Sequence, residues 1–171
     1  YGHSTPRIVM VVSDTTAPAY TSNGSLKVYM DNFNDQIAGF QFVLRSTRPD
    51  LLKFRFGPGL IDTAGTLVGG FQYVQAINRA GDSTEYWFRC IANDPFVPGT
   101  HPPVPIQQGG LAVRVPFRTF GLPAESLGFR CDIVFEKPTD FSDPFGTSIG
   151  AYVCPVYDTS YWRCLEYLGD S

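Results

Sequence analysis

The sequence predicts an all-β protein, a β-sandwich in a single domain spanning residues 1–171. Three observations predict it. Apolar and polar residues alternate in several short runs, and a period of two is typical of half-buried strands. Seventeen Gly and 14 Pro residues indicate many turns and are too many for a helical protein. Aromatic residues make up 15% of the chain, and Phe and Tyr favour strands.

The centre of the predicted core is a pair of strands within residues 25–45, joined by a polar turn. In each strand every second residue is apolar, so one face of each strand is expected to be buried. The residues expected in the core are Leu26, Val28, Met30, Phe40, Phe42 and Leu44.

An N-terminal strand is predicted at Ile8 to Val12, within residues 1–13. Its apolar run is nearly continuous, which is typical of a strand covered on both faces. The sequence leaves two roles open for it. The favoured one is pairing within its own domain, and the other is donation to the sheet edge of a neighbouring subunit.

The rest of the chain contains further strands separated by turn-rich segments. Glycines within residues 60–76 are interpreted as bends and a bulge. The proline-rich residues 93–108 are expected to cross between the sheets or to cap one end. Outside residues 25–45 and the N-terminal segment, strands are predicted at residues 51–56, 84–92, 111–118, 129–135, 148–153 and 161–168.

Four cysteines form an even set without the CxxC spacing of a zinc site. Disulfides and an oxidising, extracellular compartment are therefore expected. Cys90 and Cys131 both lie on predicted inward faces, while Cys154 and Cys164 flank a hairpin-sized connection. We therefore expect the pairs Cys90–Cys131 and Cys154–Cys164, one of three pairings that four cysteines allow.

Two kinds of surface site are suggested by short polar motifs. Asn23-Gly24-Ser25 is an N-x-S acceptor for N-linked sugar, so Asn23 is a candidate glycosylation site. The turn Asp31 to Asp35 and the cluster Asp140 to Asp143 offer oxygen ligands for calcium, although neither matches an EF-hand loop. No cofactor is expected, and solvated turn residues are the preferred interpretation of both acidic clusters.

No catalytic motif is recognisable. The two histidines, His3 and His101, lie near the terminus and in a proline-rich loop, with no adjacent nucleophile motif. A net charge of −3 and an isoelectric point near 5.2 give no basic surface for nucleic acid. No apolar run is long enough to span a membrane, and no signal peptide is recognisable, so an exported protein is expected here in mature or excised form.

Several segments together resemble a known family: VYMDNFNDQIAGFQFVLR, GLIDTAGTLVGGFQYVQA, IANDPFVPG, IQQGGLAVRVPFR and FSDPFGTSIGAYV. Over residues 25–155 they are similar to cohesin-like modules of the carbohydrate-binding-like sandwich superfamily, found in bacterial secreted proteins beside dockerin segments. The resemblance implies a jelly-roll-like antiparallel sandwich of about nine strands. The cysteines and the aromatic tail from Tyr152 to Tyr167 are not features of cellulosomal cohesins, and no binding residues are transferred.

Two functions follow as expectations, both non-enzymatic and both secreted, extracellular or on the cell surface. The first is a structural module that self-assembles as a homo-oligomer, a filament or a surface-layer subunit. The alternative is a cohesin-like module that binds carbohydrate or protein within a larger secreted complex. Aromatic residues on outward strand positions, which would stack on glycans or form an interface, are Tyr29, Trp87, Tyr152 and Trp162.

Overall fold

The computed structural model describes residues 8–13, 15–121, 131–154 and 166–168, and these residues form no helix. Their strands are β1 (Ile8–Val12), β2 (Gly24–Asn32), β3 (Gly39–Ser46), β4 (Leu52–Phe54), β5 (Tyr73–Ile77), β6 (Glu85–Ile91), β7 (Gln107–Thr119), β8 (Ile133–Ser142), β9 (Ser148–Cys154) and β10 (Glu166–Leu168).

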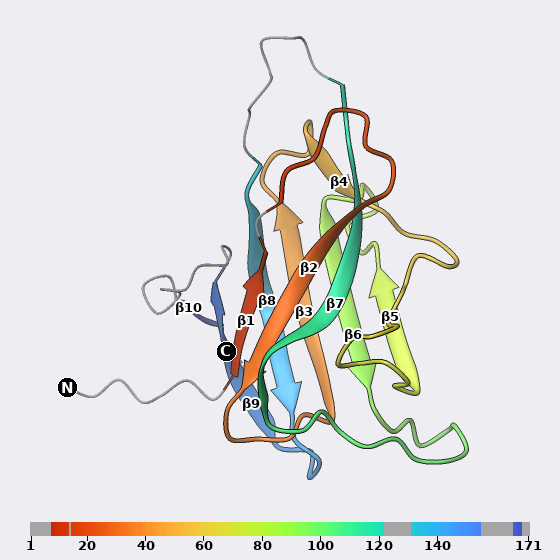
Figure 1. The fold of residues 1–171 in the computed structure, drawn as a ribbon, viewed down its shortest axis with the longest axis vertical. Coiled ribbons are helices and arrows are strands. Elements are labelled where there is room, and N and C mark those ends of the chain that lie inside the picture. Colours follow the sequence, from red (N-terminus) through yellow and green to blue (C-terminus); the bar gives the residue numbers. More distant parts are fainter. Residues whose placement is uncertain (1–7, 14, 122–130, 155–165, 169–171) are drawn as a thin grey trace, which may run out of the picture.

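The strands form two facing sheets, as Figure 1 shows. One sheet has the order β4-β7-β2-β1, and the other has the order β8-β3-β6-β5. β9 joins them, because it pairs antiparallel with β8 and, further along, parallel with β1. The predicted all-β sandwich is therefore confirmed. It is closed along β9 and ends at β4 in one sheet and β5 in the other.

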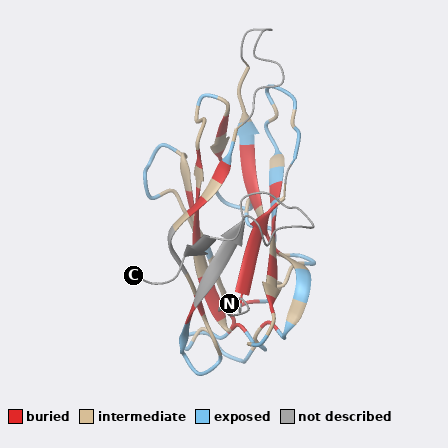
Figure 2. Ribbon diagram, turned by 90° about the vertical axis from the view of Figure 1, so that its left-hand side faces the viewer, coloured by how far each residue is buried: buried red, intermediate tan, exposed pale blue. Residues whose placement is uncertain are grey.

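β1 lies inside its sheet, between β2 and β9 of the same chain. All five of its residues are buried, in agreement with the two-sided burial that its continuous apolar run predicts. Figure 2 shows the same contrast across the molecule, with buried residues along the strands and exposed residues in the connecting loops. The strand that the sequence offered for donation is thus already paired along both edges.

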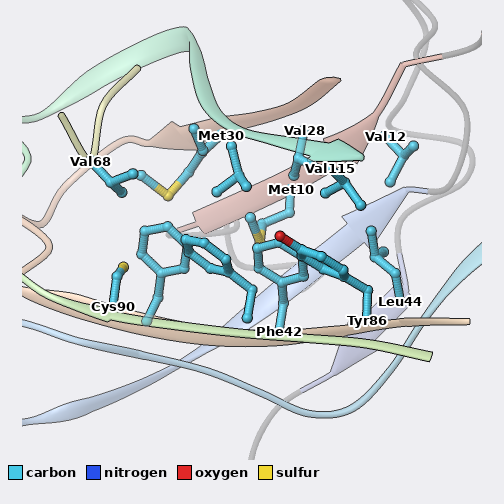
Figure 3. Close-up of a cluster of buried hydrophobic side chains, with 14 of the residues drawn as sticks. Met10, Val12, Val28, Met30, Phe42, Leu44, Val68, Tyr86, Cys90 and Val115 are labelled. Carbon is cyan, nitrogen blue, oxygen red and sulfur yellow. The ribbon is translucent and has the colours of Figure 1, made fainter. Parts of the chain in front are cut away.

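In the middle of the core, aromatic rings of the β8-β3-β6-β5 sheet lie against aliphatic side chains of the other sheet (Figure 3). Phe42 is fully buried, and its ring centroid lies 5.2 Å from that of Phe88 and 6.1 Å from that of Phe135. Met10 and Val28 face these rings from the opposite sheet. The six residues of the central strand pair that we expected in the core are all buried.

The segment between β4 and β5 fills the side of the sandwich that β9 does not close. Val68 is fully buried in the core, and Phe71 is nearly so. The Leu67 N–H donates to the Leu111 carbonyl of β7 at 2.8 Å, which fixes the segment beside that strand. The glycines here form bends, as predicted; Gly70 has a φ of +83°, and a Cβ on it would lie 2.7 Å from Nε2 of His101.

The proline-rich connection between β6 and β7 crosses one end of the sandwich, as expected. Ile37 and Val104 form an isolated antiparallel bridge there. The buried amide of Asn32 ties the end together, because its Nδ2 donates to the carbonyls of Asp35 at 2.8 Å and Pro105 at 2.9 Å. Its Oδ1 accepts a 2.6 Å hydrogen bond from Nε2 of Gln107.

Candidate functional site

The outer faces of the two sheets differ in how much of them is covered. On the β2–β7 side, Arg114 of β7 donates to the Ala64 carbonyl at 2.7 Å, so the β4–β5 segment lies against that strand. Val9 and Val11 of β1 are buried there although they lie outside the core cluster between the sheets. The outer face of the β8-β3-β6-β5 sheet has no such covering segment among the described residues.

Strand register places the side chains of this open surface in rows. Residues that lie directly opposite each other in neighbouring strands share a face, so β3 positions between the buried phenylalanines align with outward positions of β5, β6 and β8. We call this surface the β3–β6 face. Its side chains are Gln41, Val43, Arg45, Tyr73, Gln75, Ile77, Glu85, Trp87, Arg89, Val134, Glu136 and Asp140.

An apolar row runs across the middle of the β3–β6 face. Trp87 lies opposite Val43 on one side and Ile77 on the other. Val43 is only 1% exposed although it points away from the core, so its neighbours on the face cover it. The indole is held in place by two polar contacts: the Arg79 guanidinium lies 4.5 Å over its ring, and its Nε1 donates to Glu85 at 3.2 Å.

Polar side chains of both signs flank the apolar row. Arg45 forms an ion pair with Glu136 across β3 and β8, but both side chains are more than a third exposed, so the pair adds little to stability. On the other side, Gln41 lies between Asp140 and Arg89. A tryptophan-centred apolar strip within a mixed-charge border is typical of a protein-binding surface.

The predicted disulfide Cys90–Cys131 is wrong, because both residues are free thiols. Cys90 lies opposite Phe40 near the start of β3, whereas the sulfur of Cys131 lies 3.4 Å from Oγ of Ser46 at its end. Six residues of strand separate these points by about 20 Å. A disulfide needs Cα atoms within about 7 Å. Inward position alone could not reveal how far apart along the strand the two thiols lie.

The other predicted pair falls outside the described residues. Cys164 is not described, and nothing is described of the side chain of Cys154. The Cys154–Cys164 disulfide therefore stays a prediction.

The candidate calcium ligands already bond to the protein. A carboxylate oxygen of Asp31 accepts the backbone N–H of Gly109. Asp143 accepts the N–H groups of Phe145 at 2.9 Å and Thr147 at 2.8 Å, which builds the β8–β9 turn. Within the described residues, no three His, Cys, Asp or Glu side chains lie together as a metal site would need. Both acidic clusters thus have a structural role in turns.

The remaining predicted surface residues have mixed outcomes. Asn23 is exposed in a bend just before β2. Tyr29 and Trp87 are half-buried on outward positions, as expected, but on opposite sheets. The side chain of Tyr152 and all of Trp162 lie outside the described part of the chain.

β5 was not expected from the sequence, so its three members of the β3–β6 face, Tyr73, Gln75 and Ile77, were not expected there either. Its YVQAI sequence is a β-rich run with period two, which would have identified it, but the preceding glycines favoured bends. The stacking of Arg79 on Trp87 depends on the β5–β6 turn, and no pattern in the sequence indicated it.

No helix of the described residues is long and apolar enough to cross a membrane.

Neither protein-family models nor curated proteins match this chain. Solved structures do. A type I cohesin–dockerin complex from Clostridium thermocellum matches with a TM-score of 0.59 at 15% identity, over 91% of this chain and 96% of the other. The sixth cohesin of scaffoldin B from Acetivibrio cellulolyticus, solved with a Cel5 dockerin, gives 0.60 at 12% identity, over 90% and 96%.

The chain has the cohesin fold. A type III cohesin from the cell-surface anchoring scaffoldin of Ruminococcus flavefaciens shares it too, with a TM-score of 0.55 at 10% identity over 83% of this chain and 76% of the other. The predicted cohesin-like sandwich is thus confirmed at the level of the fold. Identities this low carry the cohesin fold and no residue-level equivalence.

Proposed function

We propose that this chain is a non-catalytic protein-binding module of a larger assembly, and that it holds its partner on the β3–β6 face. The observation that carries the proposal is the half-buried Trp87 on the outer face of the sheet, with the half-buried Ile77 opposite it on one side and the buried Val43 on the other. Binding hot spots are enriched in Trp and Arg and lie inside a border that excludes water. The Trp87 ring with Arg79 stacked over it fits that description.

A dockerin-type module is the partner that the comparisons support best. Two of the matching cohesins were solved with dockerins. We place the chain in a secreted or cell-surface assembly for the same reason, since one matching cohesin comes from a cell-surface anchoring scaffoldin. The exposed position of Asn23 is compatible with N-linked sugar, which mass spectrometry of the peptide containing it would detect.

Two other functions receive less support. In self-assembly by strand donation, β1 would have to be free to pair with a neighbouring subunit, but it already pairs with β2 and β9 of its own chain. A glycan platform needs an open aromatic ring, whereas the Arg79 guanidinium lies over Trp87 at 4.5 Å. A protein partner uses both groups at once, since it can bury the indole and pair with the guanidinium.

The test is calorimetric titration of the chain with the dockerins of the two matching complexes, from Clostridium thermocellum and Acetivibrio cellulolyticus. We expect at least one to bind. Trp87→Ala should weaken that binding by about 2 kcal/mol or more, about thirtyfold, because it removes the central anchor of the strip. Lys27→Ala is the matched control, since Lys27 is an exposed, long side chain on the outer face of the other sheet.

Each outcome decides a separate part of the proposal. Unchanged affinity in Trp87→Ala, with circular dichroism showing the parent fold, would overturn the assignment of the face. Loss of affinity in Lys27→Ala would move the site to the other sheet. If none of these dockerins binds, the dockerin identification is wrong.

A further inference from the structure

The edge strand β5 is less protected than the edge strand of the other sheet. Edge strands carry unpaired backbone groups, and proteins usually shield them by short length, Lys, Pro or a bulge. β4 has three residues with Lys53 at its centre. β5, from Tyr73 to Ile77, has five residues without charge or proline, and its register with β6 has no bulge.

Hydrogen bonds at both ends of β6 show which of its residues face β3. The Ser46 N–H donates to the Thr84 carbonyl at 2.9 Å, and the Ala92 N–H donates to the Ala38 carbonyl at 2.8 Å. The backbone N–H and C=O groups of successive residues in a strand point to alternate sides, so those of the even-numbered residues of β6 point toward β3. The N–H and C=O groups of its odd-numbered residues therefore point toward β5.

The register between β5 and β6 determines which backbone groups of β5 lie at the free edge. Tyr73, Gln75 and Ile77 lie opposite odd-numbered residues of β6, so their N–H and C=O groups form hydrogen bonds with that strand. Val74 and Ala76 must then direct their N–H and C=O groups outward. No hydrogen bond to these outward groups is found among the described residues.

We propose that a second copy of this chain pairs with β5 edge to edge, antiparallel about a two-fold axis at Gln75. In that register Val74 of one copy bonds Ala76 of the other in both directions, so all outward groups of the two residues are satisfied. Tyr73 lies opposite Ile77 of the second copy, an aromatic–β-branched pair that favours sheets. The strand has no charge to repel its own copy.

The proposed dimer bears on binding as well as on assembly. Directly opposite residues share a face, so the pairing joins two four-stranded sheets into one and puts both β3–β6 faces on the same side. A partner with two binding modules would then engage both faces and gain avidity. One strand buries far less than about 1,000 Å², so the association is expected to be weak and concentration-dependent.

A charge swap at Gln75 tests the dimer by sedimentation equilibrium across a wide concentration range. Gln75 is exposed, so its substitutions leave the fold intact. Gln75→Lys and Gln75→Glu should each be monomeric, because like charges lie directly opposite in the proposed register. An equimolar mixture of the two should associate at least as well as the parent.

Two further variants separate this edge from other routes of association. Ala76→Pro should also be monomeric, since it removes an outward N–H without touching β6. Phe145→Ser should associate like the parent, because Phe145 is 92% exposed in the β8–β9 turn and lies outside β5. A monomeric parent, an associating Gln75→Lys, or loss of association only in Phe145→Ser would each overturn the proposal. Gln75→Lys and Gln75→Glu are expected to be monomeric, so dockerin titrations with these variants test the binding face separately from the dimer.

Discussion

Trp87 lies directly opposite Val43 on the outer face of the β8-β3-β6-β5 sheet, and Val43 is only 1% exposed. A valine that faces away from the core is buried here because its neighbours on the face cover it. The indole itself is fixed between Arg79 and Glu85. This surface is therefore ordered before any partner arrives, which reduces the entropy lost on binding.

The aromatic core should be far more sensitive to truncation than the exposed aromatic residues. Phe42→Ala removes a fully buried ring packed on Phe88 and Phe135, and it should cost about 3–5 kcal/mol of unfolding free energy. Phe145→Ala is the matched control and should change stability by less than about 0.5 kcal/mol. Urea unfolding measures both. Equal losses would contradict the core described here.

The buried amide of Asn32 should stabilise the end of the sandwich. Asn32→Ala leaves the carbonyls of Asp35 and Pro105 without their donor, and a buried unsatisfied group costs about 1–3 kcal/mol. Asn34→Ala, at an exposed position in the same turn, should have little effect. Thermal unfolding of the two variants compares them directly. A stable Asn32→Ala would mean that the connection between β6 and β7 is held elsewhere.

Differential alkylation should find Cys90 and Cys131 free without any reductant. Cys131 is half-buried and should react in the folded protein. Cys90 is buried, and burial also raises the pKa of its thiol, so it should react only after unfolding. Peptide mapping reads out each cysteine separately. A Cys90–Cys131 disulfide peptide would contradict the fold, because the two lie at opposite ends of β3.

Stability should fall at alkaline pH because of two buried groups. Burial raises the pKa of the Cys90 thiol and of the Tyr86 phenol above their ordinary values of 9.0 and 10.0. The folded chain keeps protons that the unfolded chain loses, so unfolding becomes easier above about pH 9, by up to about 1.4 kcal/mol per pH unit for each group.

Variants can assign this pH dependence to its source. Cys90→Ala should reduce the loss from about pH 9 upward, and Tyr86→Phe should reduce it from about pH 10 upward. Urea unfolding across the alkaline range measures the slope for each variant and the parent. A parent whose unfolding free energy does not fall in this range would show that neither group is buried in its neutral form.

Local pattern predicted most of the strands, because alternation reflects burial directly. Leu26, Val28 and Met30 are buried as expected, and the continuous apolar run of β1 is buried on both faces. Pro116 shows the limit of such reasoning. Proline within a strand favours a sheet edge, yet β7 pairs with β2 at this residue and with β4 from the next residue onward.

Features that depend on distance between elements were not predictable from one strand at a time. Their inward positions predicted a disulfide between Cys90 and Cys131, whereas the two residues lie beside opposite ends of β3. The β3–β6 face likewise depends on four strands and their registers, so only Trp87 was identified in advance. The burial of Val43 likewise follows from the side chains around it and not from its own position in the sequence.

Hydrogen exchange of the chain with and without a bound dockerin tests the central claim most directly. Partner contact on the β3–β6 face should slow amide exchange in β3 and β6, centred on the peptides that contain Val43 and Trp87. β2 and β7, on the other sheet, should exchange as in the free chain. Protection confined to β2 and β7, or to the loops at the ends of the sandwich, would contradict the assignment of the binding face.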